Sequence, residues 1–236
     1  MKILAIETSG QHAGVAIVDE YITIGEMTLN AKTGEKSWTH SEILMQGVSE
    51  LFRLTGVNRS HIGYVAYSAG PGAFTGLRIG AATAIGLARG LGVPSVAVPT
   101  LDALAYNIFG GIDTVIPMMD ARRGQVYFGI YRSNGQQLTL EGNYDALPVE
   151  EVLAKIPQGS SITVLGCGAD AYKNEIQTIM PGAKFAPQNN NRQRAASIAC
   201  RAAQMLSAGH NPATTKTELI YVRAPQAVRD LEAKNQ

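Results

Sequence analysis

The residues best able to bind an anion lie in the glycine-rich segment SAGPGAFTGLRIGAATAIGLARGL, residues 68–91. Its Gly70-Pro71-Gly72 turn follows a predicted strand and precedes a predicted helix, and the N–H groups at a helix N-terminus bind phosphate readily. The segment lacks the lysine of a P-loop and does not match the GxGxxG spacing of dinucleotide-binding loops. Two interpretations stay open: the glycines hold a phosphate, or they let another backbone approach the helix closely.

The helix predicted at about 73–91 carries a row of very small side chains. Every fourth residue is glycine or alanine, namely Gly72, Gly76, Gly80, Ala84 and Ala88. Rows with this spacing form the ridges and grooves along which helices pack. Polar residues such as Thr75 and Arg78 occupy only a narrow strip, so this helix must be covered on two sides. We expect its own sheet on one side and a second helix, internal or from a partner, on the other; a wholly internal core helix is the alternative.

Two carboxylates, Glu7 and Asp120, each end a predicted strand before a hairpin, at matching points of the two halves of the chain. There they could hold a metal or a nucleotide between two lobes. Thr8, Ser9, Gly70 and Gly72 would complete such a site, as the trace of an inherited phosphate-binding site. A carboxylate at a strand end is also a common turn former, so this alternative stays open.

The run His40-Ser41-Glu42 invites a hydrolase interpretation, but a serine beside a histidine in sequence is not a catalytic triad. Glu42 in a first helical turn complements the helix dipole, and we interpret the run as a helix start. The other histidines have no ligand-spaced partners, and Cys167 and Cys200 lie far apart. We predict no catalytic residue, no metal site and no cofactor.

The composition narrows the classes of protein to consider. The net charge of +1 is unlike the basic footprint of a protein that holds nucleic acid alone, although a local basic patch is compatible with it. Without an uninterrupted apolar run of about 18 residues, no membrane span is predicted. The start MKILAIETSGQHAG is too short and polar for a signal peptide. We expect a cytoplasmic globular protein.

Each half of the chain predicts the same order of elements, β-β-β-α-β-α. In the first half, strands are predicted at 2–9, 14–19, 22–29 and 62–68, and helices at 40–55 and 73–91; a short apolar run follows at 94–98. In the second half, strands are predicted at 114–121, 125–132, 136–141 and 161–168, and helices near 149–156, 169–180 and 195–208. This order predicts a duplicated, two-lobed α/β protein with a mixed sheet in each lobe, residues 1–99 and 100–236.

Several stretches together resemble the family of bacterial tRNA threonylcarbamoyladenosine biosynthesis proteins called TsaB or YeaZ. These stretches are ILAIETS near the start, HSEIL at 40–44, the 68–94 segment, VPTLDALA at 98–105 and IYVRAP at 220–225. The resemblance implies the duplicated fold of actin, Hsp70 and sugar kinases. It also implies a non-catalytic scaffold and activator, which pairs with the catalytic paralogue TsaD and, in a larger complex, with the ATPase TsaE. That complex attaches threonylcarbamoyl to adenosine 37 of tRNAs that read ANN codons. The resemblance thus implies tRNA as a partner through the complex.

The catalytic paralogue carries two metal-binding histidines in a run that matches Val98–Leu104 here. Their positions hold Thr100 and Leu104, and leucine cannot bind a metal, so the resemblance implies that the enzyme's centre is missing. In place of the family's more frequent aspartate this chain has Glu7. The two rival functions are an independent ATP-dependent kinase or carbamoyl transferase of the same fold, and a peptidase, for which no nucleophile set or HExxH motif is present.

In the family, the HSE helix and the helix after the GPG turn form the face that binds the paralogue, or a second copy when the protein is alone. The predicted interface comprises His40, Leu44, Val48, Gly72, Thr75, Gly76, Arg78, Gly80, Ala84 and Ala88. On this prediction, Gly80→Leu or Ala84→Trp leaves the monomer folded and abolishes pairing.

Overall fold

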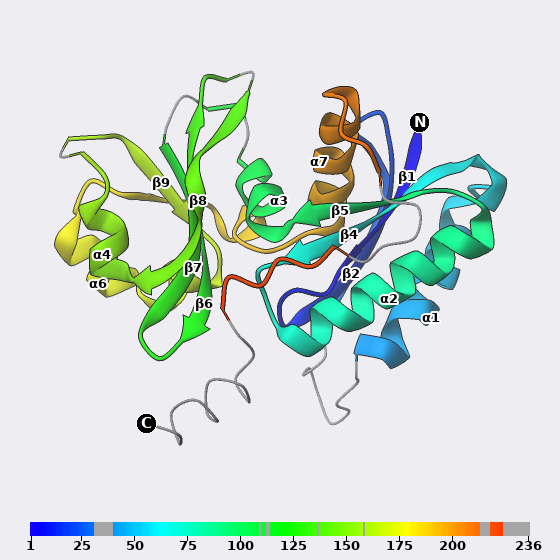
Figure 1. The fold of residues 1–236 in the computed structure, drawn as a ribbon, viewed down its shortest axis with the longest axis horizontal. Coiled ribbons are helices and arrows are strands. Elements are labelled where there is room, and N and C mark those ends of the chain that lie inside the picture. Colours follow the sequence, from blue (N-terminus) through cyan, green and yellow to red (C-terminus); the bar gives the residue numbers. More distant parts are fainter. Residues whose placement is uncertain are drawn as a thin grey trace.

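Two five-stranded sheets lie side by side, each covered by helices on both faces (Figure 1). The computed structural model describes residues 1–30, 40–108, 110–111, 114–135, 137–157, 159–212 and 218–223. Among these residues, no helix combines the length and the hydropathy that a membrane crossing demands.

The first sheet has the strand order β3-β2-β1-β4-β5. Its strands are β1 (Lys2–Glu7), β2 (His12–Asp19), β3 (Ile22–Asn30), β4 (Ile62–Gly70) and β5 (Ser95–Pro99). The hairpin-connected strands β1, β2 and β3 pair antiparallel, while β4 and β5 join in parallel. Helices α1 (His40–Thr55) and α2 (Phe74–Leu91) cover one face of this sheet, and a short 3-10 helix (Arg59–His61) precedes β4.

The second sheet repeats this topology with the strand order β10-β9-β6-β7-β8. Its strands are β6 (Thr114–Arg122), β7 (Gln125–Ser133), β8 (Leu138–Pro148), β9 (Ile162–Leu165) and β10 (Lys184–Phe185). Helices α4 (Val149–Ala154), α5 (Cys167–Ala171) and α6 (Lys173–Ile179) cover one face. Read from the β8 edge, every neighbour and every parallel or antiparallel pairing matches the first sheet. The predicted duplication is therefore confirmed.

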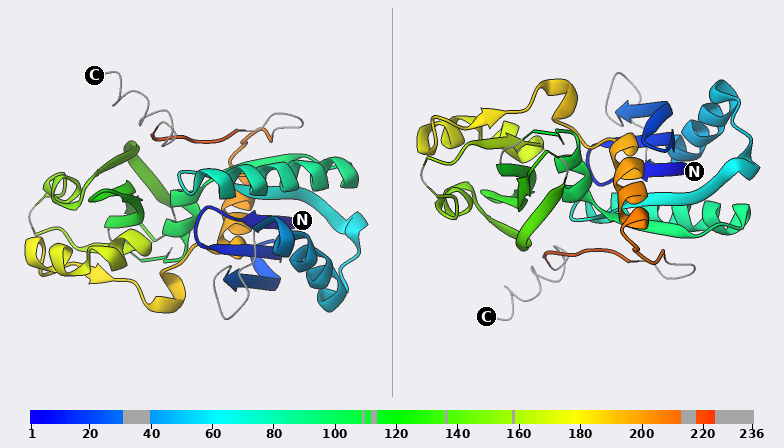
Figure 2. Two further views of the ribbon diagram at one scale, coloured as in Figure 1. Left: turned by 90° about the horizontal axis from the view of Figure 1, so that it is seen from below. Right: turned by 90° about the horizontal axis from the view of Figure 1, so that it is seen from above.

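Each repeat also ends in a helix that packs on the sheet of the other repeat. α3 (Thr100–Tyr106) follows the first sheet but buries Leu101 and Leu104 against the second. α7 (Ala195–Ser207) follows the second sheet but buries Ile198 and Ala202 against the first. Figure 2 shows α7, in orange, beside the strands of the first lobe. The predicted division assigns α3 and α7 to the second lobe; α3 packs on the second sheet, whereas α7 packs on the first.

Two further differences from the predicted elements have local causes. The helix expected near 169–180 is two helices, because Tyr172 between them leaves helical geometry with φ of −110° and ψ of 26°. The sequence pattern did not predict the helix at 100–106, because a segment of seven residues is too short to show a helical period. The bounds predicted for α1, 40–55, are confirmed.

A buried carboxylate joins the two lobes. Asp102 on α3 accepts hydrogen bonds from the hydroxyls of Tyr131 (2.6 Å) and Tyr144 (2.5 Å) on the second sheet. It also accepts two from the Arg201 guanidinium on α7, at 3.0 and 2.8 Å. Burial raises the pKa values of both tyrosines, so they stay neutral donors. Removing one partner from such a buried ion pair leaves an uncompensated buried charge, which is strongly destabilising. The cluster therefore holds α3 and α7 together.

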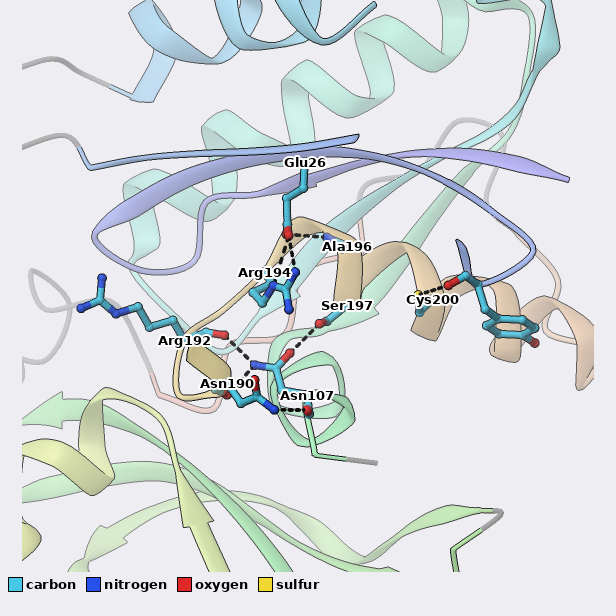
Figure 3. Close-up of polar contacts among 9 residues, drawn as sticks. Glu26, Asn107, Asn190, Arg192, Arg194, Ala196, Ser197 and Cys200 are labelled. Carbon is cyan, nitrogen blue, oxygen red and sulfur yellow. Dashed lines mark hydrogen bonds and ion pairs between the residues drawn. The ribbon is translucent and has the colours of Figure 1, made fainter. Parts of the chain in front are cut away.

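The chain between β10 and α7 is also held in place. Asn107, just after α3, donates to the carbonyls of Asn190 and Arg192 at 2.8 and 2.6 Å, and Ser197 on α7 donates to the Asn107 side chain (Figure 3). Glu26 of β3 accepts from the Arg194 guanidinium and from the Ala196 N–H at the first turn of α7. The segment QNNNRQR reads as a solvated loop by composition, but here its polar groups anchor the crossing between lobes.

Candidate functional site

The structure brings three members of the predicted phosphate site together at the start of α2: Thr8, Ser9 and Gly72. Residues Thr8 and Ser9, which follow β1, lie directly on the first turns of α2. The Ala73 N–H donates to the Ser9 carbonyl at 2.7 Å, and the Thr8 hydroxyl donates to the Gly76 carbonyl at 2.8 Å. The Ser9 carbonyl therefore occupies the N–H group of Ala73, the residue before α2.

The small-residue row of α2 makes this packing possible. A Cβ atom added at Gly72 would lie 2.6 Å from the Ser9 carbonyl oxygen. Cβ atoms at Gly76 and Gly80 would lie well inside van der Waals distance of Thr8, against its carbonyl oxygen and its hydroxyl respectively. Of the two interpretations of these glycines, close backbone approach is the one that the structure shows, and the approaching backbone belongs to the same chain.

We therefore correct the predicted interface at its apolar positions. Ala84 and Ala88 continue the row into the core of the first lobe, where Leu44 and Val48 of α1 also lie; all four are at most 4% exposed. Gly76 and Gly80 are buried too. Side chains used by the lobe's own core cannot meet a partner, and larger residues at Gly80 or Ala84 would disrupt the monomer. The His40 side chain lies outside the described residues.

Glu7 is buried against its own loop. Its Oε1 atom accepts hydrogen bonds from the Ser9 N–H and the Ser9 hydroxyl, both at 2.5 Å, while Oε2 has no hydrogen-bond partner within the described residues. Burial raises the pKa of this carboxyl to about 7, and the hydrogen bonds from Ser9 act in the opposite direction. The Glu7 carboxyl is thus turned back on its own loop, with its Oε1 atom engaged by Ser9.

The counterpart of Glu7 in the second repeat, Asp120, lies in different surroundings. It is exposed, and its Oδ1 atom accepts the Arg122 N–H at 2.8 Å. Across the described parts of the chain, no three side chains of the His, Cys, Asp or Glu type come together as a metal site would need. The structure therefore does not assemble the two strand-end carboxylates into a metal centre.

The two positions matched to the paralogue's metal ligands have structural roles. Thr100 is fully buried, and its hydroxyl accepts the Gly70 N–H at 3.1 Å, which ties α3 to the turn before α2. Leu104 is buried in the second lobe's core. Neither side chain faces an open site.

The outward surface of α2 is exposed along its length. The exposed residues of α2 are Thr75, Arg78, Ala82, Gly86, Arg89 and Gly90. In the part of the chain that the structure describes, no atom lies within 4 Å of the position that a Cβ would take at Gly86 or Gly90. On α1, Met45 is 48% exposed and Leu54 is 63% exposed. The name α1–α2 outer face is used below for Met45 of α1 together with the exposed residues of α2 between 75 and 90.

The segment 218–223, here called the strap, crosses from the first lobe to the second (Figure 1, red). The Ile220 N–H donates to the Ala69 carbonyl at 2.7 Å, and the Arg223 guanidinium donates to the Ala121 carbonyl at 3.3 Å. The sequence pattern of the strap has no period that could have predicted this course, and only the motif IYVRAP drew attention to it.

Comparisons with known proteins identify the family to which this chain belongs. A family model described as "TsaD: tRNA N6-adenosine threonylcarbamoyltransferase" matches residues 24–233. The tRNA threonylcarbamoyladenosine biosynthesis protein TsaB of Bacillus subtilis (strain 168) is 32% identical over 81% of this chain and 83% of its own. The TsaB of Escherichia coli (strain K12) is 29% identical over 99% of this chain and 100% of its own. The chain belongs to the TsaB family.

Solved structures agree with this assignment. YeaZ from Pseudomonas aeruginosa superimposes with a TM-score of 0.76 and 26% identity, over 93% of this chain and 99% of that chain. A second structure from that organism, described as similar to peptidase YEAZ, gives a TM-score of 0.77. The ethanolamine utilization protein EutJ of Carboxydothermus hydrogenoformans shares only the fold, with a TM-score of 0.53 and 14% identity. The TsaB chain described here has the two-lobed α/β architecture of the actin and sugar-kinase group, as predicted.

Proposed function

We propose that this TsaB-family chain is the non-catalytic scaffold and activator of the cytoplasmic complex that installs threonylcarbamoyl on adenosine 37 of tRNA. Its partners are the catalytic paralogue TsaD and, in the larger complex, the ATPase TsaE, while tRNA is handled by the assembly. One observation carries the proposal: Thr8 and Ser9 pack directly against α2, at the place where the sequence predicts a phosphate site.

The surroundings of that place support the same conclusion. Glu7 is turned back on Ser9, and Thr100 and Leu104 stand where the paralogue's metal ligands would be. An ATP-dependent kinase or carbamoyl transferase needs carboxylates that face a ligand between the lobes. The chain keeps the fold of an enzyme, and we assign its contribution to binding the paralogue.

The α1–α2 outer face is the surface that we assign to this pairing. Its glycines at positions 86 and 90 each cost about 1 kcal/mol relative to alanine inside a helix. Among the described residues, no atom lies within 4 Å of the position that a Cβ would take at either glycine. A partner backbone that packs closely against α2 would need them. Of the residues predicted from sequence, Thr75 and Arg78 stay in this assignment. The same face would pair with a second copy when the chain is alone.

The substitution Gly86→Arg tests the assignment, with Gly182→Arg in the second lobe as its matched control. Both positions have open space around the glycine, and neither has a positive φ. We expect both variants to fold, and only Gly86→Arg to lose the heterodimer with the paralogue and tRNA modification in a reconstituted mixture. Size-exclusion chromatography with light scattering reports the pairing. A Gly86→Arg variant that pairs and supports modification like the wild type would refute the interface.

A further inference from the structure

A hollow lies on the surface of the first lobe, between α2 and the strap. Its volume is about 420 Å³, and it is lined by Arg78, Ala82, Leu219 and Tyr221. Arg78 and Ala82 belong to the α1–α2 outer face and are one helical turn apart. The hollow is therefore part of the surface that we assign to the paralogue, and it extends that surface from the helix onto the strap.

The strap is a fixed wall of this hollow. The Ile220 N–H donates to the Ala69 carbonyl at 2.7 Å. The Glu218 N–H donates to the hydroxyl of Tyr67 at 3.1 Å. Leu219 and Ile220 pack against the core of the first lobe. Contacts within the chain thus hold the strap beside α2 before a partner binds.

The Arg78 guanidinium is held in one orientation at the edge of the hollow. It stacks 3.9 Å from the centroid of the Phe74 ring, and its Nε atom donates to the Tyr221 hydroxyl at 3.3 Å. The Tyr221 ring is itself 5.4 Å from the Phe74 ring, centroid to centroid. Because Nε is engaged, the donors left for a ligand are the Nη1 and Nη2 groups at the tip of the side chain. Paired N–H groups of a guanidinium match the two oxygens of one carboxylate.

Within the described residues, the chain provides no carboxylate for this tip. Arg78 forms a hydrogen bond with Tyr221 there and no ion pair. The helix Phe74–Leu91 contains two arginines and no acidic residue. An oriented arginine on a helix surface whose charges are all positive is complementary to a partner of negative charge.

We propose that the hollow receives an acidic side chain of the paralogue, whose carboxylate binds the tip of Arg78. The methylene groups of that side chain lie against Ala82 and Leu219, and the Tyr221 ring closes one side. Because Arg78 is already oriented, it loses less conformational entropy when it binds. The inference rests on the proposed function, which supplies the partner, and it adds the strap and the charge of the group that is bound.

Calorimetric titration of the purified paralogue into Arg78→Gln tests the carboxylate contact. The matched control is Arg59→Gln, because Arg59 is also exposed, lies 5.6 Å from the ring centroid of Phe52 and is outside the outer face. Arg78→Gln should weaken pairing by roughly 30-fold, as at arginine hot spots of other interfaces. The control should leave the affinity unchanged. Wild-type affinity in Arg78→Gln, or an equal loss in the control, would overturn the proposal.

A charge reversal identifies the bound group. Arg78→Glu should pair more weakly than Arg78→Gln, because two carboxylates then face each other. In the Arg78→Glu chain, replacing one acidic residue of the paralogue with lysine should restore the affinity at least tenfold. Acidic residues of the paralogue are replaced with lysine one at a time to find it. If none of these substitutions restores pairing, the occupant is not acidic and the proposal is wrong.

Tyr221 is a positioning residue in this proposal and has its own test. Tyr221→Phe keeps the ring and removes the hydroxyl that accepts the Arg78 Nε–H. It should weaken pairing about threefold in the wild-type chain and not at all in the Arg78→Gln chain, because no guanidinium is left to orient. Equal losses in the two chains would show that Tyr221 does not act through Arg78, and would overturn this role.

Failure of this inference and failure of the proposed function give different results. Loss of pairing in Gly86→Arg together with normal pairing in Arg78→Gln and Arg78→Glu overturns only the assignment of the hollow. Normal pairing in Gly86→Arg overturns the interface of the proposed function. Weaker binding of a tRNA transcript by an Arg78→Gln complex that pairs normally would assign the hollow to RNA, and this result would also overturn the inference.

Discussion

On the inner face of α2, Gly76 and Gly80 lie against Thr8, whereas on the outer face a Cβ atom at Gly86 or Gly90 would meet no described residue within 4 Å. The inner glycines are explained within the chain, since any side chain there would collide with the loop after β1. The outer glycines weaken the helix with no compensating contact in the isolated protein. The inner residues of α2 therefore build the core of the first lobe. The outer residues are available to a partner, and we propose the interface there.

The largest expected effect lies on the inner face. Gly76→Ala should lower the free energy of unfolding by about 3 kcal/mol, because the new methyl group collides with the Thr8 carbonyl, a backbone atom that cannot rotate away. Urea denaturation followed by circular dichroism measures the change. A variant of wild-type stability would show that the loop after β1 is not held against α2.

The next effect concerns Glu7, beside the same loop. Its pKa is about 7 in the folded chain against an ordinary value of 4.5, so the folded state holds this proton more tightly than the unfolded state. The contribution of this group to stability is complete below pH 4.5 and falls by about 3 kcal/mol as the pH rises to 7. Glu7→Gln should abolish that fall. Denaturation midpoints between pH 4.5 and 8 measure it.

The exposed glutamate Glu151 of α4 provides the control for this pH profile. Glu151→Gln should leave the wild-type dependence intact. A Glu7→Gln variant that keeps the wild-type fall in stability would mean that Glu7 is solvated and available to a ligand.

The smallest effect has the opposite sign and belongs to the outer face. Gly86→Ala should raise the free energy of unfolding of the isolated chain by up to about 1 kcal/mol, because alanine favours the helix and the added methyl group meets no atom. The same substitution should weaken pairing with the paralogue, since it fills the space that a close backbone contact uses. Titration calorimetry of the pairing measures the second effect. Stronger stability together with unchanged pairing would place the partner elsewhere.

The sequence predicts local elements well and their neighbours poorly, for physical reasons. The apolar period of α1 and the β-β-β-α-β-α order along the chain depend on residues close in sequence, and both are confirmed. The period of α2 shows that Gly76, Gly80 and Ala84 share a face, but not what covers that face. The covering loop, Thr8 and Ser9, is about 70 residues away in sequence. The exchange of α3 and α7 between lobes depends on similarly distant contacts.

The candidate site shows the same limit. Thr100 and Leu104 could be recognised from the resemblance as positions without metal ligands, and the structure gives each a place in the fold. Glu7 as a buried carboxyl was not predictable, because its environment depends on where Ser9 lies. The strap carries no periodic pattern, and its course depends on contacts with distant residues, Ala69 in the first lobe and Ala121 in the second.

The central claim is that this chain acts through the outer face of α2 and contributes no chemistry at the end of β1. The rate of threonylcarbamoyl transfer to tRNA in a mixture reconstituted with the paralogue and the ATPase tests it most directly, with Glu7→Gln and Gly86→Arg compared side by side. The account predicts the wild-type rate for Glu7→Gln and a rate near background for Gly86→Arg. An inactive Glu7→Gln variant that still pairs normally, beside an active Gly86→Arg variant, would contradict it.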